Sequence, residues 1–338
     1  MTALQNERPL EPHLPARPTV SVVIPTCRRD ELLARCLQGV LAQEWPPESL
    51  QVIVVDDGES PSTQEVIGRA ALAHPDVQVL LLGGGRNGPA AARNTGWRAA
   101  TGDIIAFIDD DAFPADSRWI SGGVEALEAS PSAAVAGLVT VPAPGTPTDF
   151  QRNVKHLERA DFLTCNAFVR RAALETVGGF DERFRAPFRE DSDLQFRLEE
   201  IAGPIAHTAA AAVVHPAPPG KFAESLRRQR YVMYNALLYR KHPGRYRAEI
   251  QRRPPLTYYA MTLLLLVGAV GLARRARFGP AALAAWALLD LWFFLRRVRG
   301  IEHSPRHLAD MALTSLLIPP LAVYWRLRGA LKFRVFFI

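Results

Sequence analysis

The sequence has little cysteine, and its cysteines form no metal-binding or disulfide pattern. Cys27, Cys36 and Cys165 are an odd number and include no C-x-x-C pair, so neither a zinc site nor a disulfide framework is indicated. This usage fits a reducing compartment. Residues 1–18 are polar and rich in proline and lack the apolar segment of a signal peptide, so we expect a loose tail there.

Acidic residues are scarce toward the C-terminus. Residues 221–338 contain 5 Asp and Glu against 21 Lys and Arg, whereas residues 1–220 contain 29 against 19. The net charge of +6 therefore hides an acidic front part and a strongly basic back part. Because the basic residues flank long apolar runs, we expect them to face membrane lipid, and we expect no nucleic acid as a partner.

The pattern that is present is that of an α/β protein. From about Thr19, short β-branched runs alternate with helical stretches, which predicts a largely parallel sheet covered by helices. The chain is long enough for about two domains. The expected strands are residues 20–24, 51–55, 77–82, 104–108, 134–141 and 209–214, and the expected helices include residues 87–100 and 191–201.

Three consecutive carboxylates, Asp109, Asp110 and Asp111, stand where the expected strand 104–108 ends. Carboxylates this close repel one another, so a metal ion, or a substrate that carries one, is expected to offset their charge. Oxygen ligands of this kind suit Mg²⁺ or Mn²⁺. Apolar residues on both sides of the triple argue against a solvated loop.

Polar residues also follow the first two expected strands. Pro25 and Thr26 end the first, and Asp56 and Asp57 end the second. In open α/β sheets, ligands bind beyond the carboxyl ends of the strands, so one crevice could collect these residues and the acidic triple. Taken alone, Asp56 and Asp57 also fit a simple turn, and Arg93 in the next helix also fits a solvated face.

Seven short motifs follow one another along the sequence. They are Ser21-Val-Val-Ile-Pro-Thr, Val54-Val-Asp-Asp-Gly, Gly88-Pro-Ala-Ala-Ala-Arg-Asn-Thr-Gly, Phe107-Ile-Asp-Asp-Asp, Asn166-Ala-Phe-Val-Arg-Arg, Gly178-Gly-Phe-Asp-Glu and Glu190-Asp-Ser-Asp-Leu. In their order they resemble the motifs of the family 2 glycosyltransferases, which have the GT-A fold, a Rossmann-like nucleotide-diphospho-sugar transferase domain. The resemblance runs from Val20 to about Pro216 and implies transfer of a sugar from a nucleotide-diphosphate sugar to an acceptor hydroxyl.

The resemblance also implies roles for residues on the donor side. Asp109 would contact the ribose or the metal, Asp111 would be the direct metal ligand, and His215 is a candidate third ligand, although a lone histidine before proline can equally be structural. The cation would neutralise the charge that develops on the departing diphosphate. The other residues expected around the nucleotide are Pro25, Thr26, Asp56, Asp57, Arg93 and, with no defined task, Asp110.

The acceptor hydroxyl must lose a proton as it attacks, and a carboxylate can accept it. Asp191 matches the base of the family, and its place in the first turn of a helix would keep it ionised. On their own, Asp191 and Glu190 also fit ordinary helix-capping acids. Glu190, Thr164 and Asn166 would line the donor-sugar or acceptor side, and direct attack would invert the anomeric configuration.

The segment 225–246 interleaves arginines with aromatic and aliphatic residues. This pattern predicts either a helix at a membrane interface or a helix packed on the catalytic domain. Processive members of the family often carry a Q-x-x-R-W element in this region. Gln229-Arg230-Tyr231 does not match that element, so we expect addition of a single sugar.

Three apolar stretches follow, at residues 256–273, 279–295 and 308–325, each near the lower length limit for a membrane-spanning helix. Pro319 and Pro320 would kink the third. Every connecting loop is basic, so the positive-inside rule cannot assign an orientation. A spanning hairpin, helices within one leaflet and soluble core helices all stay open, and the tail 331–338 also resembles an interfacial segment.

We therefore predict a membrane-associated, metal-dependent, inverting glycosyltransferase whose catalytic domain faces the cytoplasm at the inner or plasma membrane. Its acceptor would be a glycan or a lipid-linked molecule of the cell envelope. The expected parts are a flexible tail (1–18), a GT-A catalytic domain (19–222), basic amphipathic interfacial helices (223–252) and hydrophobic membrane-associated or transmembrane helices (253–338). Two alternatives are a nucleotidyltransferase, for which the Gly-rich, Lys-bearing phosphate loop is missing after Thr26, and a non-catalytic nucleotide-binding membrane scaffold.

Overall fold

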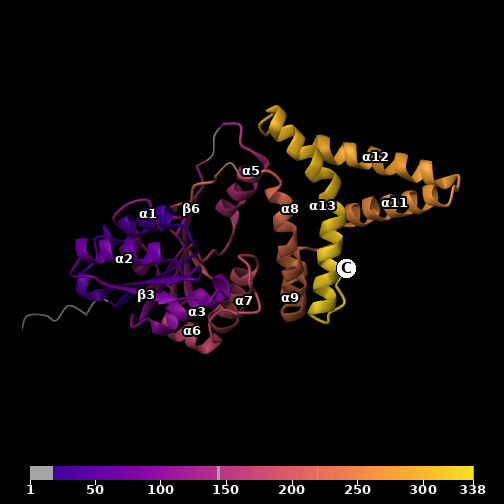
Figure 1. Cartoon of the computed structure of the whole chain (residues 1–338). Helices are drawn as coiled ribbons and strands as arrows, with labels where there is room; N and C mark the ends of the chain where they lie inside the picture. Colours follow the sequence, from indigo (N-terminus) through magenta and orange to yellow (C-terminus); the bar gives the residue numbers. More distant parts are fainter. Residues whose placement is uncertain (1–17, 143–144, 219, 338) are drawn as a thin grey trace, which may run out of the picture.

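The computed structural model describes residues 18–142, 145–218 and 220–337. The expected tail therefore lies outside the described residues except for Pro18. An α/β domain forms one side of the molecule, and helices from the C-terminal third form the other (Figure 1).

The first part of the α/β domain is a parallel sheet in the order β3-β2-β1-β4. Its strands agree with the predicted ones to within two residues at each end. The carboxyl ends of neighbouring parallel strands therefore lie along one edge of the sheet. The strands are β1 Val20–Thr26, β2 Leu50–Asp56, β3 Gln78–Gly83 and β4 Ile104–Ile108, and the helices that connect them are α1 Asp30–Leu41, α2 Pro61–Ala73 and α3 Pro89–Ala99.

The second part of the sheet corrects the prediction of a largely parallel sheet. Beyond β4 the order continues β7-β6-β8-β5, and three of the seven strand pairings among the described residues are antiparallel. The sheet is therefore mixed. The elements of this part are β5 Phe113–Pro114, α4 Trp119–Glu128, β6 Ala134–Thr140, α5 Asp149–Lys155, β7 Asn166–Arg170, α6 Arg171–Val177, α7 Glu190–Ala202 and β8 Ala206–Val214.

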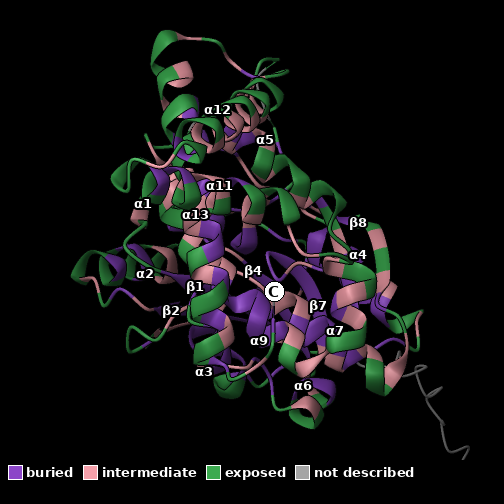
Figure 2. Ribbon diagram, turned by 90° about the vertical axis from the view of Figure 1, so that its right-hand side faces the viewer, coloured by how far each residue is buried: buried purple, intermediate pink, exposed green. Residues whose placement is uncertain are grey.

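Helices cover both faces of the sheet, and a buried apolar cluster lies under each layer (Figure 2). Alternate residues of β1 point to opposite faces, so Val22 and Ile24 join the cluster under α1, while Val23 joins the cluster under α3. Strands buried on both faces are continuous apolar runs, which explains why these strands were visible in the sequence. A Cβ at Gly96 would lie 2.4 Å from Val23 Cγ1, so α3 packs this close only with glycine there.

The basic segment after the sheet packs on the catalytic domain, as one of the two alternatives predicted. Leu237 and Tyr234 of α9 lie in a third buried cluster with Phe184 and Phe196 of the α/β domain and with Phe333 after the last helix. Its apolar stripe is therefore covered by protein. The segment consists of α8 Glu224–Arg228, a 3-10 turn Gln229–Met233, α9 Tyr234–Lys241, α10 Pro243–Arg245 and a π-helical turn Tyr246–Ile250.

Three long apolar helices complete the described chain: α11 Leu256–Ala273, α12 Phe278–Arg297 and α13 Pro305–Lys332. Each is long and apolar enough to cross a membrane, with mean hydropathies of 1.9, 1.6 and 1.4 over the most apolar window. α13 continues as one helix through Pro319 and Pro320. The predicted membrane association therefore has its structural basis in these helices.

Candidate active site

The predicted crevice forms where β1, β2 and β4 end. Thr26 pairs with Asp56 in the parallel register of β1 and β2, and Asp109 to Asp111 follow β4, the other neighbour of β1. Topology thus brings together residues that lie far apart in the chain. Pro25 and Thr26 are buried in the sheet, and the loop after them begins with the exposed Cys27.

Asp110, which had no defined task, is the most deeply buried of the three carboxylates. Its Oδ2 accepts hydrogen bonds from Thr26 Oγ1 at 2.7 Å and from Arg29 Nε at 3.0 Å. Burial raises the pKa of Asp110 to about 7, against the opposite effect of Arg29. Asp110 therefore ties the loop after β1 to the end of β4.

Asp111 is partly exposed and lies between the guanidinium of Arg29 and the imidazole of His215. Arg29 Nη1 donates to its Oδ2 at 2.6 Å, and His215 Nε2 lies 3.3 Å from its Oδ1. Burial alone would raise the pKa of Asp111, but His215 and Arg29 lower it overall. Conversely, burial alone would lower the pKa of His215, and Asp111 raises it. The pairing of β5 with β8 brings these two residues together.

Arg93 lies beneath the site and joins its two acidic groups. Its side chain is only 4% exposed, and its Nη2 donates to Asp109 at 2.7 Å while its Nη1 lies 3.4 Å from Glu190 Oε1. Burial raises the pKa of Glu190 to about 8, with Asp191 acting in the same direction and Arg93 opposing both. Arg93 thus places the start of α7 beside the end of β4.

Asp191 lies in the first turn of α7 and is held by Thr164. Thr164 Oγ1 donates to Asp191 Oδ1 at 2.6 Å, and the Thr164 backbone N–H donates to Oδ2 at 3.4 Å. Burial raises the pKa of Asp191, and Arg93 and Thr164 offset this only in part. A carboxylate oriented in this way can accept a proton.

Asp56 and Asp57 both bind backbone amides. Asp56 is buried and accepts from the N–H groups of Gly58 and Ser60, at 2.8 and 2.7 Å. Asp57 is partly exposed and accepts from the N–H groups of Asn87 and Gly88, just before α3. Asp56 therefore stabilises the turn after β2, while Asp57 also joins that turn to the next loop at the crevice.

Comparison with known proteins identifies this arrangement. The family model described as "Glycosyl transferase family 2" matches residues 21–191, which include every residue above except His215. The chain belongs to glycosyl transferase family 2. Membership in this family makes it a glycosyltransferase and decides against the two alternatives, a nucleotidyltransferase and a non-catalytic scaffold.

Proteins similar to this glycosyltransferase align with different shares of its chain. Glycosyltransferase AglE of Haloferax volcanii is 30% identical over 223 residues, 63% of this chain and 71% of that protein. The GalNAc(5)-diNAcBac-PP-undecaprenol beta-1,3-glucosyltransferase of Campylobacter jejuni is 30% identical over 110 residues, 32% of this chain and 33% of that protein. The mannosyltransferase PcManGT of Pyrobaculum calidifontis, solved with GDP-Man and Mn²⁺, is 22% identical with a TM-score of 0.57 and covers 89% of this chain and 88% of its own, which shows the GT-A fold.

The predicted metal ligands of the glycosyltransferase are only partly brought together. Among the described residues, no group of three or more His, Cys, Asp and Glu side chains is placed to hold a metal ion. Asp111 and His215 are adjacent, whereas Asp109 is paired with Arg93. Mg²⁺ is commonly held by one or two carboxylates plus substrate phosphates, so the Asp111 carboxylate at this edge fits such an ion. The buried Nδ1 of His215 has no hydrogen-bond partner within the described residues.

Asn166 does not line the site. Its side chain is 1% exposed: its Oδ1 accepts from Trp119 Nε1 at 2.8 Å, and its Nδ2 donates to the carbonyls of Leu138 and Ala211, both at 2.9 Å. These three hydrogen bonds stabilise the core between β6, β7 and β8. The structure therefore places Asn166 inside the domain and leaves Thr164 on the site side.

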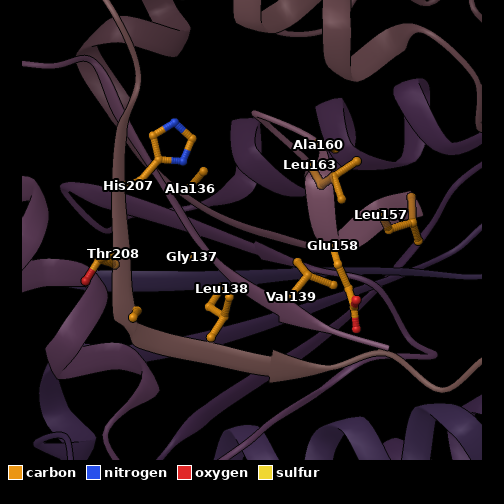
Figure 3. A pocket seen from close by; sticks show the side chains of 11 residues that line it. Ala136, Gly137, Leu138, Val139, Leu157, Glu158, Ala160, Leu163, His207 and Thr208 are labelled. Atoms are coloured by element: carbon orange, nitrogen blue, oxygen red, sulfur yellow. The ribbon is translucent and has the colours of Figure 1, made fainter. Parts of the chain in front are cut away.

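A separate cavity of about 260 Å³ lies between β6, β8 and the 3-10 turn His156–Arg159 (Figure 3). Gly137, Leu138, Glu158 and His207 are among the residues that line it, and none of the predicted site residues does. The register shift between β6 and β8 at Gly137/Leu138 opens the sheet at this point. The cavity is therefore distinct from the crevice at the strand ends.

Arg29 is the functional residue that sequence reasoning missed. It contacts both Asp110 and Asp111 and supplies the positive charge that the acidic triple requires. A signal was present, since Arg28-Arg29 follows the first strand on the same sheet edge as the triple. Charge complementarity between adjacent strand ends would have identified it.

Proposed function

We propose that the protein transfers a single sugar from a nucleoside-diphosphate sugar to an acceptor hydroxyl, with inversion at the anomeric carbon. The observation that carries this proposal is the Arg93 bridge, which sets the start of α7, with Asp191, beside the acidic end of β4. Donor and base can then act from opposite sides of one sugar. The lack of a Q-x-x-R-W element around Gln229 supports single addition.

Asp191 is the general base in this mechanism. The acceptor oxygen forms a bond to the anomeric carbon, the bond from that carbon to the diphosphate oxygen breaks, and the acceptor proton moves to Asp191. Thr164 holds the carboxylate through both its hydroxyl and its backbone N–H, which would fix the orientation of Asp191 toward the acceptor. The leaving group departs as the nucleoside diphosphate with its extra negative charge.

The leaving diphosphate needs positive charge near it. Asp111 and His215, with Asp109 as a further oxygen donor, would hold a Mg²⁺ or Mn²⁺ ion. When bound, the ion would act as a Lewis acid on the diphosphate. PcManGT was solved with Mn²⁺, which supports this choice of metal. Arg29 and Asp57 would contact the nucleotide side together with Thr26 and Pro25 of the loop after β1.

The kind of acceptor and the location of the protein are inferred from the C-terminal helices. A catalytic domain attached to a membrane suits an acceptor that is itself lipid-linked, and the name of the Campylobacter jejuni relative specifies such an acceptor. The catalytic domain would face the cytoplasm, where nucleotide sugars are made available. A role in building the cell envelope follows from the same attachment.

The test is the Asp191→Asn variant of the full chain, assayed for sugar transfer with Mg²⁺ or Mn²⁺. General-base catalysis contributes about 10²- to 10⁴-fold, so kcat should fall within that range while donor binding persists. Glu200→Gln, on the exposed side of the same helix, is the matched control and should keep wild-type activity. Equal turnover in Asp191→Asn and wild type would contradict the assignment of the base.

A further inference from the structure

We propose that the three apolar helices do not act alike: the α11–α12 hairpin crosses the bilayer, while α13 lies in the plane of the cytoplasmic surface against anionic lipid headgroups. This inference rests on the proposed membrane location and does not depend on the reaction. Figure 1 shows α11 and α12 projecting together from the side of α13, crosswise to it and away from the α/β domain. One flat bilayer therefore cannot be crossed by the hairpin and by α13 at once.

The hairpin has the exposure and the packing of a membrane-inserted pair. In the most apolar windows, 17% of α11 and 6% of α12 is buried inside the protein. A Cβ on Gly271 would lie 2.6 Å from Gly279 Cα, and one on Gly268 would lie 2.6 Å from Leu283 Cδ2. Helices associate in lipid through such small residues, because lipid gives them no hydrophobic driving force to pack. Large apolar side chains are exposed on both helices, among them Leu263, Leu266, Leu288 and Leu291.

The hairpin also has the length and the charged ends of a spanning pair. Helices of 18 and 20 residues measure about 27–30 Å at 1.5 Å per residue, which matches a hydrocarbon core of about 30 Å. Arg274, Arg275 and Arg277 stand at the tip, and Arg296 and Arg299 stand at the base. Arginines at both ends would then reach the headgroups on the two sides.

α13 has two different faces. Met311, Ser315, Ile318, Ala322 and Gly329 are buried, and the helix packs against α8, α9 and the turn between them. The opposite face is exposed and apolar at helical spacing over most of the helix. The exposed residues of this stripe are Leu313, Leu316, Leu317, Tyr324, Leu327 and Leu331.

The position of this stripe indicates that it contacts the bilayer. Since α8 and α9 lie on the α/β-domain side of α13, the stripe faces the side from which the hairpin projects (Figure 1). Both surfaces therefore meet the same membrane. Exposed Arg328, Lys332 and Arg334 at the C-terminal end, and Arg306 at the start, would meet anionic headgroups, and Tyr324 and Leu331 would enter the acyl boundary.

The first experiment tests whether the hairpin crosses. The full chain carries one exposed cysteine among its described residues, Cys27 in the catalytic domain, whereas Cys36 and Cys165 are buried. A membrane-impermeant maleimide is added to spheroplasts and to inverted membrane vesicles that contain either wild type or Cys27→Ser/Arg275→Cys. We expect Cys27 to react in inverted vesicles and the tip position to react in spheroplasts. Reaction of both in the same preparation, or of the tip in neither, overturns the crossing.

The second experiment measures depth. In the Cys27→Ser background, single nitroxide labels are placed through Leu313→Cys, Leu317→Cys and Leu331→Cys on α13, and through Leu263→Cys and Leu288→Cys on the hairpin, in vesicles of phosphatidylcholine with phosphatidylglycerol. Relaxation by oxygen and by a nickel chelate should give one common shallow depth along α13 and a greater depth on the hairpin. Leu72→Cys, on α2 and 84% exposed, is the aqueous control. A depth that rises to a maximum in the middle of α13 overturns the in-plane placement.

The two proposals fail separately. If wild type transfers sugar in detergent but the labels show a single-sided hairpin or a spanning α13, the membrane arrangement is wrong and the reaction stands. If the labels behave as expected but no nucleoside-diphosphate sugar is turned over, the reaction is wrong and the membrane arrangement stands. Vesicles of phosphatidylcholine alone should reduce contact of the Leu331 label with lipid, because the basic end of α13 then loses its anionic partner.

Discussion

At the scale of single residues, the site depends on how buried carboxylates are held. Asp191 has a raised pKa because burial penalises its charge more than Arg93 and Thr164 favour it. A general base must be ionised, so activity should fall as the pH drops through this raised pKa. We expect the acid limb of kcat/KM to lie above the value of about 3.9 typical of free aspartate.

The variant Thr164→Val tests how the Thr164 hydroxyl affects the pKa of Asp191. It removes the hydroxyl that donates to the carboxylate, so the charged form loses a favourable interaction and the acid limb should move to still higher pH. Thr176→Val, which removes a hydroxyl bonded to Ala172 on the exposed side of α6, should leave the profile unchanged. If Thr164→Val and wild type had the same pH–rate profile, Thr164 would not influence the ionisation of Asp191.

Asn166 supports the fold of the domain, and a truncation should show it. Asn166→Ala removes the partner of the buried indole N–H of Trp119 and one donor each from the carbonyls of Leu138 and Ala211, and a buried group left unpaired costs about 1–3 kcal/mol. The free energy of unfolding should therefore fall by about 3 kcal/mol in chemical denaturation. Asn153→Ala, exposed on α5, should change it by less than about 0.5 kcal/mol. If Asn166→Ala lost activity but kept wild-type stability, Asn166 would instead act on the donor-sugar or acceptor side, as the sequence predicted.

At the scale of elements, α7 connects the base to the C-terminal helices. Arg189 precedes α7 in a left-handed conformation, with φ 78°, and its Nε donates to Asn235 Oδ1 of α9 at 2.8 Å. Asp193, further along α7, is fully buried and contacts Lys241 of α9 and the following His242. Residues at both ends of α9 therefore hold the end of α7 that carries Asp191.

Asn235→Ala should lower kcat by roughly tenfold with little change in the KM for the donor. A hydrogen bond to a charged group is worth about 1.5–3 kcal/mol, and its loss would let the start of α7 move without altering the nucleotide side. Asn235→Asp keeps an acceptor for Arg189 and should restore most of the rate. If both variants lose the same amount, the effect is one of packing and α9 does not position the base.

The elements that could be predicted from sequence are those whose signal is local. β1, β2 and β4 are buried on both faces and are therefore continuous apolar runs, and α3 and α7 have helical periodicity. β7 carries no such run and is a strand because β4 and β6 flank it. The ion pairs of Arg29 and Arg93 join residues 81 and 97 positions apart, so no local pattern shows these contacts, although the place of Arg29 directly after β1 offers a signal.

At the scale of the whole molecule, the sequence showed an acidic part and a basic, apolar part but not how they meet. The apolar residues of 225–246 serve a protein core, whereas the stripe of α13 is left exposed. Both segments are apolar and basic in sequence, and the difference lies in which partner covers each face. Partner choice is a property of the assembled fold and has no local signature.

The stability of the whole chain should also report binding of donor and metal. A ligand at 100 times its dissociation constant stabilises the native state by about 2.7 kcal/mol, so the true donor should raise the melting temperature of the protein in detergent. If Asp111 and His215 hold the metal that binds the diphosphate, a chelator should remove most of this shift, and Asp111→Asn should do the same in the presence of Mn²⁺. Asp116→Asn, exposed five residues further along, should keep the full shift. A donor-dependent shift that survives both chelation and Asp111→Asn would mean that Arg29, and no metal, neutralises the diphosphate.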